Sequence, residues 1–419
     1  MTVQLFLIYL LNISFLAWVI QKAHKKVVEL PIAKLYYPAL AFKVICGISL
    51  GLIYTFYYEA GDTILFFEKA KSILELPKIE FLKEVFMSSI PHEQRSILPV
   101  TKIIGLVLLI TGSSYWLASV YFSLFSFVGT FYFVKQLTLK YPTLVNSASI
   151  AFLFFPSIVF WSSGVLKESL VFGMMMFMLG FFMTYLNSKK INLWHLVLSV
   201  LGAWLMIVIK YYIAAVFLPI LLIVFIVSII KGRNLFGTIR PIYQYMSISI
   251  ITLGAFYWAT TIQFNLDLSR IFSVAKANQL EILRISDQAS VINYLDETDS
   301  TLSILVNLLI ALFSGLFRPL IPDLSSIAQL FSSIENILIV ILFVIGFRRK
   351  VVLNNQDKIL IAGLLLFILM LSSLLAYSSP NFGTLARYKV YYMPFFLFLV
   401  LINSPAIMWF STKFSKSSS

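Results

Sequence analysis

The chain has 419 residues, of which 60% are hydrophobic, 16% aromatic and only 12% charged, with a net charge of +14. Soluble domains are about 45–50% apolar and about a quarter charged, so this composition excludes an ordinary soluble protein. It also excludes a disordered chain, because a sequence with a mean hydropathy of +0.92 cannot stay solvated. We interpret the positive charge as lysines beside membrane spans, and we expect no nucleic-acid partner.

Apolar runs that are long enough, or nearly so, for a hydrocarbon core about 30 Å thick recur along the whole chain. The sequence predicts an all-α polytopic membrane protein with about eleven spans, at roughly 3–20, 39–56, 115–134, 146–161, 165–186, 193–209, 212–230, 243–261, 326–346, 359–377 and 390–409. Two further stretches, 97–112 and 302–317, are short and end at polar breaks. We expect them to be half-helices that dip into the outer leaflet with their ends covered by protein.

The distribution of basic residues predicts the orientation of the spans. If neither short stretch crosses and the N-terminus is outside, the inner loops carry many lysines and arginines but only two acidic residues, Glu29 and Asp357. Lys43 lies within the second predicted span. We therefore expect an outer N-terminus and a cytoplasmic C-terminus.

Two long outer loops, 57–114 and 262–325, are expected to carry amphipathic helices. Apolar residues recur at helical spacing over 63–86, with a break at Pro77, and a weaker helical pattern covers 268–285. We predict a single integral domain over 1–410 and a disordered cytoplasmic tail over 411–419. The single Cys46 excludes an intramolecular disulfide, and the three histidines lack metal-ligand spacing.

Charged side chains gather at the predicted outer edge of the membrane, where each costs a few kcal/mol unless it is paired or hydrated. The candidates are Glu59 and Asp62 after the second span, Lys167 and Glu168 in the fifth, Lys210 between the sixth and seventh, Arg318 after a half-helix, and Arg387 and Lys389 before the last span. Arginines and lysines bind phosphate, and a nearby carboxylate can act as a general base. The pattern indicates a site for a lipid-linked phosphate or pyrophosphate.

Simpler roles stay open for several of these residues. Asp62 fits the N-cap of the helix that follows it, and Lys210 fits a lysine that extends from a helix end toward the interface. Glu335, within the ninth span, fits a hydrogen-bonded residue between helices. His92 fits a solvated loop. The acidic residues Asp296, Glu297 and Asp299 fit a solvated face, with a divalent-cation site as the alternative.

The order of these features resembles the GT-C-fold glycosyltransferases, membrane enzymes that use polyprenyl-phosphate sugars, such as protein O-mannosyltransferases and the aminoarabinose transferases of lipid A. The segments that carry the resemblance are GDTILFFEKA (61–70), the proline-containing segment and span over 96–133, FFPSIVFWSSGVLKESLVFG (154–173) and RYKVYYMP (387–394). The resemblance covers the first half of the chain well and the second half loosely. The family often has two adjacent acidic residues, whereas Glu59 and Asp62 are three apart.

The resemblance implies that Asp62, or secondarily Glu59, is the catalytic base. It also implies that Lys167, Lys210, Arg318 and Arg387 contact the donor phosphate, with Glu168 and Lys389 as further substrate-binding candidates. The expected partners are a polyprenyl-phosphate-linked sugar donor, a glycan or lipid acceptor and membrane lipids. The expected location is the outer face of the inner (cytoplasmic) membrane of a bacterium, in cell-envelope glycan synthesis. No definite cofactor is implied, and a divalent cation stays open.

Two alternatives remain. The GDT segment after an outer edge and the late Arg-Tyr also resemble exopolysaccharide and O-antigen polymerases, which join whole lipid-linked repeat units. Many of those polymerases carry a very long outer loop, which this chain lacks. The other alternative is a lipid-linked glycan flippase or transporter. Transporters tend to carry charges near the bilayer midplane within inverted repeats. The edge location of the charges and the lack of an internal repeat therefore favour an enzyme.

Overall fold

The computed structural model describes residues 3–87, 97–188, 190–232, 268–295, 301–347 and 355–402, together with residues 250, 254 and 404. Within these ranges the regular elements are helices, and the β-structure consists of one bridge between Val291 and Asn381. The all-α prediction is confirmed for this part of the chain. Most of the predicted span over 243–261, as well as His92, Asp296–Asp299 and the tail over 411–419, lies outside the described residues.

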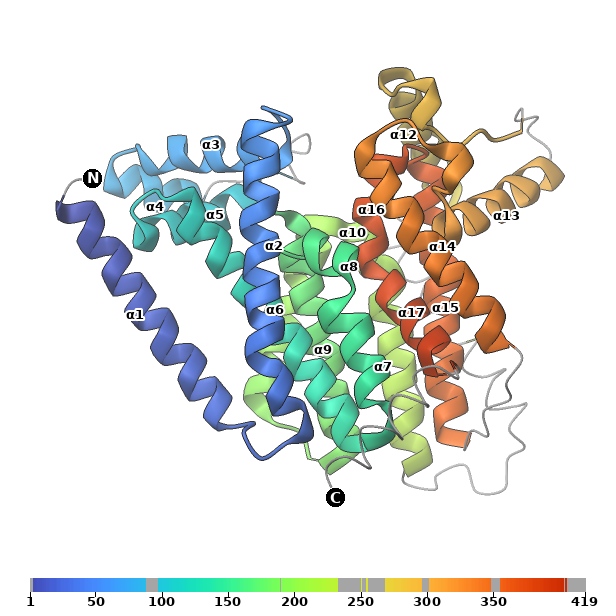
Figure 1. Cartoon of the computed structure of the whole chain (residues 1–419), viewed down its shortest axis with the longest axis horizontal. Helices are drawn as coiled ribbons and strands as arrows, with labels where there is room; N and C mark the ends of the chain where they lie inside the picture. Colours follow the sequence, from blue (N-terminus) through green and yellow to red (C-terminus); the bar gives the residue numbers. More distant parts are fainter. Residues whose placement is uncertain are drawn as a thin grey trace. The chain divides into compact units, whose positions relative to one another are not determined.

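Seven helices among the described residues are long and apolar enough to cross a membrane, or eight if a bent pair near the C-terminus is one span. They are α1 (Val3–Lys25), α2 (Tyr36–Phe56), α6 (Tyr115–Lys140), α9 (Lys167–Ser188), α10 (Leu193–Gly232), α14 (Ile327–Phe347) and α15 (Asn355–Ser378) (Figure 1). Large apolar side chains are exposed on many of them, among them Trp18 and Phe331. The protein is a multi-pass membrane protein.

The chain divides into two compact units, Met1–Tyr211 and Tyr212–Ser419. In the first unit, α6 and α9 pack backbone against backbone because glycines face each other. A Cβ atom on Gly129 would lie 2.1 Å from the carbonyl oxygen of Gly173. Serines on α6, among them Ser119, Ser123 and Ser126, are also fully buried. Small residues of this kind allow close helix approach in membranes.

Helix α1 is mostly exposed and makes polar contacts with the rest of its unit, the most extensive of them at Asn12. The Asn12 side-chain amide donates to the carbonyl oxygens of Ile8 (2.8 Å) and Ile110 (2.9 Å), and its Oδ1 accepts from the hydroxyl of Tyr121 (2.6 Å). Interhelical hydrogen bonds of this type hold membrane helices together where apolar burial gives no driving force.

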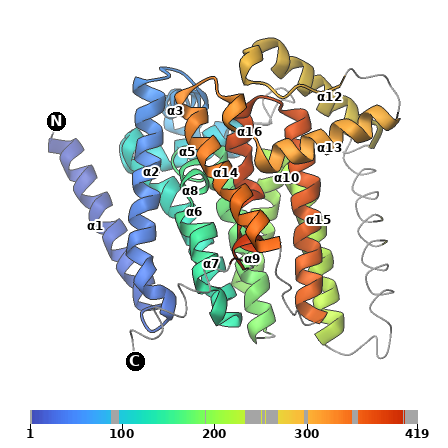
Figure 2. The ribbon, with the colours of Figure 1, turned by 45° about the vertical axis from the view of Figure 1, so that its right-hand side comes forward.

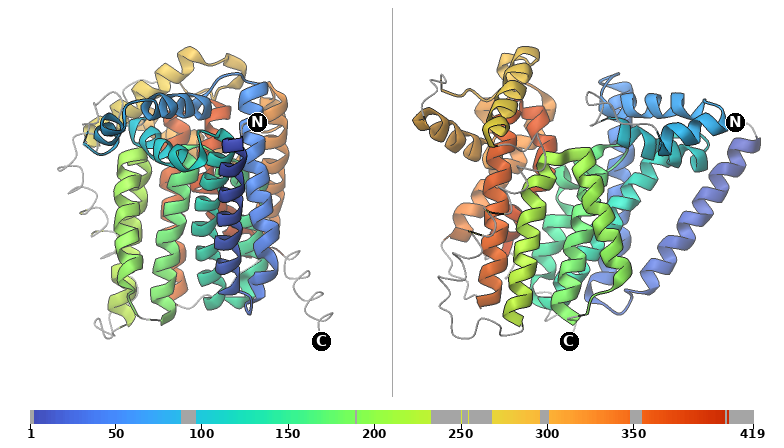
Figure 3. Two further views of the ribbon diagram at one scale, coloured as in Figure 1. Left: turned by 90° about the vertical axis from the view of Figure 1, so that its left-hand side faces the viewer. Right: turned by 180° about the vertical axis from the view of Figure 1, so that it is seen from behind.

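Three helices of the first long loop lie at one end of α2 and α6: α3 (Asp62–Leu74), α4 (Lys78–Phe86) and α5 (Leu98–Thr111) (Figures 1 and 3). As predicted, an amphipathic pair is interrupted at Pro77, which precedes α4. The apolar α5 has 14 residues and is therefore about 21 Å long, shorter than a hydrocarbon core of about 30 Å. This length fits the expected half-helix.

The predicted span over 146–161 is not one continuous helix, which corrects the sequence interpretation. It consists of the short 3₁₀ helix η3 (Pro142–Leu144), α7 (Val145–Ser149), a π-helical turn η4 (Ile150–Phe154) and α8 (Pro156–Trp161). Phe155 is extended, with φ −72° and ψ 120°. Pro156 explains the break, because proline lacks an N–H donor and disfavours helical backbone in the residue before it.

Helix α10 is interrupted at Lys210, whose φ of −144° and ψ of 73° are not helical. A continuous helix of its 40 residues would be about 60 Å long, about twice the hydrocarbon thickness. The interruption falls between the predicted spans 193–209 and 212–230, so the sequence located it correctly.

The second unit contains α12 (Leu268–Ile285), η6 (Gln288–Ser290), α13 (Thr301–Phe317), η7 (Ile321–Asp323), α14, α15, α16 (Phe382–Tyr388), η8 (Lys389–Tyr391) and α17 (Met393–Ile402). Helix α13 packs across α15, and Gly315 permits this contact because a Cβ there would lie 2.7 Å from the carbonyl oxygen of Ser372 (Figure 2). Near the start of the predicted last span, 390–409, the chain is bent by 65° between Phe382–Tyr391 and Met393–Ile402. The helix predicted over 268–285 is confirmed.

Candidate functional site

The two candidate carboxylates lie at the turn between α2 and α3. Glu59 is exposed and has a positive φ of 52°. Gly61, with φ 131°, is the N-cap of α3. Asp62 is therefore the first helical residue, and it is not the N-cap, the simpler role considered for it above. Asp62 is half-buried, and its negative charge is favourable at a helix N-terminus.

The first two turns of α3 contact the beginnings of two long helices. The Thr63 hydroxyl shares a hydrogen bond of 2.7 Å with the Tyr115 hydroxyl at the start of α6. The Lys167 ammonium, at the start of α9, lies 4.8 Å from the ring centroid of Phe66. Because Phe66 and Asp62 are four residues apart, they share one face of α3. The structure therefore brings Lys167 to the face of α3 that carries Asp62.

The turn that leads into α9 is built from buried small residues. Gly164 has a φ of +69° and donates its N–H to the Ser123 hydroxyl at 3.0 Å, and its carbonyl accepts from Ser169 at 2.8 Å. The Lys43 ammonium, from the middle of α2, donates to the hydroxyl of Ser162. This interaction was missed at the sequence level, although a lysine inside an apolar span was the available signal.

Glu168 and Lys210 form a buried ion pair. The Lys210 Nζ lies 2.6 Å from Glu168 Oε1, and their side chains are 3% and 0% exposed. The pair joins the first turn of α9 to the point at which α10 is interrupted. Side chains of adjacent residues on a helix point about 100° apart. Because Glu168 points into the unit, toward Lys210, its neighbour Lys167 points to a different side of α9.

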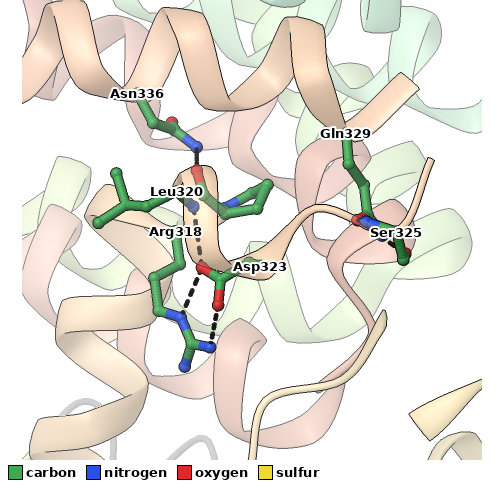
Figure 4. A network of polar contacts seen from close by, with 7 residues as sticks. Arg318, Leu320, Asp323, Ser325, Gln329 and Asn336 are labelled. Carbon is green, nitrogen blue, oxygen red and sulfur yellow. Dashed lines mark hydrogen bonds and ion pairs between the residues drawn. The ribbon is translucent and has the colours of Figure 1, made fainter. Parts of the chain in front are cut away.

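In the second unit, the candidate Arg318 is engaged by a carboxylate that the sequence analysis missed. Its Nε and Nη2 donate to Asp323 Oδ2 (3.0 Å) and Oδ1 (2.5 Å), and the Leu320 N–H donates to Oδ2 at 2.8 Å (Figure 4). Burial alone would raise the pKa of Asp323, but the Arg318 and Leu320 hydrogen bonds and the charge of Arg318 hold that pKa below its ordinary 3.8. The available signal was an acidic residue five positions after the arginine.

The other predicted cations of this unit lie nearby on α16 and η8. The buried Lys389 donates to the Arg318 carbonyl oxygen (2.6 Å) and to Asn336 Oδ1 (3.2 Å). Asn336 in turn donates to the Pro319 carbonyl oxygen at 2.9 Å (Figure 4). The half-buried Arg387 guanidinium lies 5.9 Å from the ring centroid of Tyr388. Lys389 therefore holds the Arg318 carbonyl directly and the Pro319 carbonyl through Asn336.

A groove of about 510 Å³ adjoins this network. Its walls come from one side of α13 and from the segment that follows it, and they consist of Leu309, Ile310, Phe313, Ser314, Arg318, Leu320, Pro322 and Asp323. Pockets of about 300–1,000 Å³ with mostly apolar walls and few polar groups are typical of small-molecule sites.

The candidate residues thus fall into two groups, one in each compact unit. Asp62, Lys167, Glu168 and Lys210 belong to the first, together with Glu59, whereas Arg318, Arg387 and Lys389 belong to the second. In the described part of the chain, no group of three or more His, Cys, Asp or Glu side chains is arranged to hold a metal ion. No protein-family model, curated protein or solved structure matches this chain.

Proposed function

We propose that the protein is a membrane glycosyltransferase that moves a sugar from a polyprenyl-phosphate donor to a glycan or lipid acceptor. The reaction would take place at the outer face of a bacterial cytoplasmic membrane, in a chain with about eleven crossings and an outer N-terminus. The observation that carries the proposal is the approach of the Lys167 ammonium to the face of α3 that begins with Asp62. A carboxylate and a cation, both half-buried, are thereby held at one end of the first unit.

In the proposed reaction, the hydroxyl oxygen of the acceptor attacks the anomeric carbon of the sugar, and Asp62 accepts the proton of that hydroxyl. The bond from that carbon to the phosphate oxygen breaks, and polyprenyl phosphate leaves with its electron pair. Attack opposite the leaving group inverts the anomeric carbon. Lys167 compensates the negative charge that develops on the phosphate, which is the main electrostatic requirement of this step.

The buried residues of the first unit take supporting roles in this proposal. Glu168 and Lys210 form a buried ion pair, so we assign them to anchoring the start of α9. Lys43 and Ser162 brace the turn before it. Substrate contact falls to the half-buried Lys167 and Asp62, and the exposed Glu59 is the secondary candidate for the base.

The test compares Asp62→Asn with the wild type, each purified and mixed with native lipid extract, while mass spectrometry follows polyprenyl-linked glycans. Glu68→Gln is the matched control, because Glu68 is an exposed carboxylate on the same helix. We expect wild type and Glu68→Gln to consume a polyprenyl-phosphate monosaccharide and Asp62→Asn to lose at least about a hundredfold in rate. Full activity of Asp62→Asn contradicts its role as the base.

The same experiment separates the alternatives. Lengthening of a pyrophosphate-linked oligosaccharide by whole repeats would identify a polymerase. Binding of a lipid-linked glycan without turnover by the wild type would favour a transporter or flippase and would overturn the enzyme proposal.

A further inference from the structure

The groove beside α13 has an apolar wall and one polar end. Leu309 and Phe313 are one helical turn apart and are 66% and 53% exposed. A hydrocarbon chain lying along this surface would reach the polar end at Arg318 and Asp323.

The polar end is electrically neutral. Asp323 engages two of the five N–H donors of the Arg318 guanidinium, which leaves three for other contacts. The low pKa of Asp323 keeps its carboxylate ionised at neutral pH. The guanidinium carbon also lies 5.0 Å from the ring centroid of Phe382, so one face of the group is covered.

Of the residues that the structure describes, Arg318 and Asp323 are the only charged ones in the lining of the groove, so the lining has no net charge. Lys389 is buried, directs its ammonium to the Arg318 carbonyl and to Asn336, and is not part of the lining. The lining does include Ser314, whose buried hydroxyl has no hydrogen-bond partner among the described residues. The groove therefore offers both donors and acceptors without net charge.

We propose that this groove binds a lipid whose head group is uncharged and rich in hydroxyls, such as a neutral glycolipid. The hydrocarbon chain lies against Leu309 and Phe313. Hydroxyls of the head group donate to the Asp323 carboxylate and accept from the remaining N–H groups of Arg318. This assigns Arg318 a partner different from the phosphate that the family resemblance implies.

A phosphate fits this polar end less well. Its oxygens could accept from the remaining N–H groups of Arg318 only beside the Asp323 carboxylate, which would repel them at close range. Asp323 is also fixed by the Leu320 N–H, so its withdrawal would cost a charge-assisted hydrogen bond. A sugar hydroxyl, by contrast, adds to the existing pair without breaking it. The inference concerns the second unit alone and does not depend on the transfer reaction proposed above.

The test measures binding of two tritiated probes, farnesyl β-glucoside and farnesyl phosphate, by equilibrium dialysis against the full-length protein in amphipol. The two probes share one hydrocarbon chain and differ in the charge of the head group. We expect the wild type to bind the glucoside roughly tenfold or more tightly than the phosphate. Leu309→Trp, which fills the groove, should abolish binding of the glucoside, whereas Leu302→Trp, outside the lining, should retain it.

Asp323→Asn supplies a second test, because it frees the Arg318 guanidinium from its carboxylate. We expect this variant to lose affinity for the glucoside and to gain affinity for the phosphate. Tighter binding of the phosphate than of the glucoside by the wild type overturns the proposal, and so does glucoside binding that Leu309→Trp leaves unchanged. Neither measurement uses glycosyl transfer, so failure of this inference is distinguishable from failure of the proposed function.

Discussion

The ammonium of Lys210 lies 2.6 Å from a carboxylate oxygen of Glu168, and both side chains are almost completely buried. The two residues are 42 positions apart in the chain and connect the start of α9 to the interruption in α10. In a low-dielectric environment, an ion pair of this kind is costly to form but much more costly to break on one side.

We therefore expect Lys210→Met and Glu168→Leu each to destabilise the protein by about 3 kcal/mol, because each leaves a buried charge without its main counter-charge. The double variant should lose much less than the sum of the two single losses. Thermal unfolding of the three variants in one detergent would give this comparison. Strictly additive losses would show that the pair is not energetically coupled.

The α6–α9 contact should be intolerant of a single methyl group. In Gly129→Ala, the new Cβ would meet the Gly173 carbonyl oxygen at 2.1 Å, so the backbones must separate. We expect a loss of about 1–3 kcal/mol or more in stability and a lower yield of folded protein. Gly202→Ala is the control, because its Cβ would lie at an ordinary 3.6 Å from Met174. Equal stability of the two variants would contradict the tight packing described here.

The Arg318–Asp323 pair should make stability depend on pH in the acidic range. The pKa of Asp323 is lowered in the folded protein, so its contribution is present above the ordinary value of 3.8 and is lost as pH falls through the lower folded value. We expect the difference in melting temperature between wild type and Asp323→Asn to be constant from pH 7 to about pH 5 and to shrink below about pH 4. A difference that grows on acidification would have the wrong sign.

The orientation can be tested with single cysteines, because Cys46 is buried and is the only cysteine in the sequence. In a Cys46→Ala background, we place one cysteine at Glu75 after α3 and another at Lys190 after α9, both exposed positions. A membrane-impermeant maleimide should label Glu75→Cys in intact cells and should label Lys190→Cys only after lysis. The opposite pattern would reverse the predicted orientation.

Local features of the fold were predictable from the sequence. The break at Pro77, the helix over 268–285 and the interruption near Lys210 all follow from proline chemistry or from the spacing of apolar residues. The span over 146–161 was predicted as one helix because its composition is apolar throughout. Hydropathy does not register the effect of Pro156 on the residue before it.

The partners of the candidate residues were much less predictable. The sequence indicated that Lys210, Glu168 and Arg318 are unusual, since charges at the edge of an apolar run are costly. It did not indicate that the first two form an ion pair or that Asp323 engages the third. Which side chains meet depends on helix packing between segments far apart in the chain, and a single sequence contains no direct record of those contacts.

The hydrogen bond from Lys43 to Ser162 has a consequence for the biogenesis of the protein. Its two residues are separated by 119 positions, and Phe172, whose ring centroid lies 5.6 Å from the ammonium, is made later still. At about 5–20 residues per second, ribosomes need about 6–24 s to synthesise that interval. During this time α2 must accommodate a lysine without either contact. The nascent helix therefore occupies a different environment before α8 and α9 are made than in the finished protein.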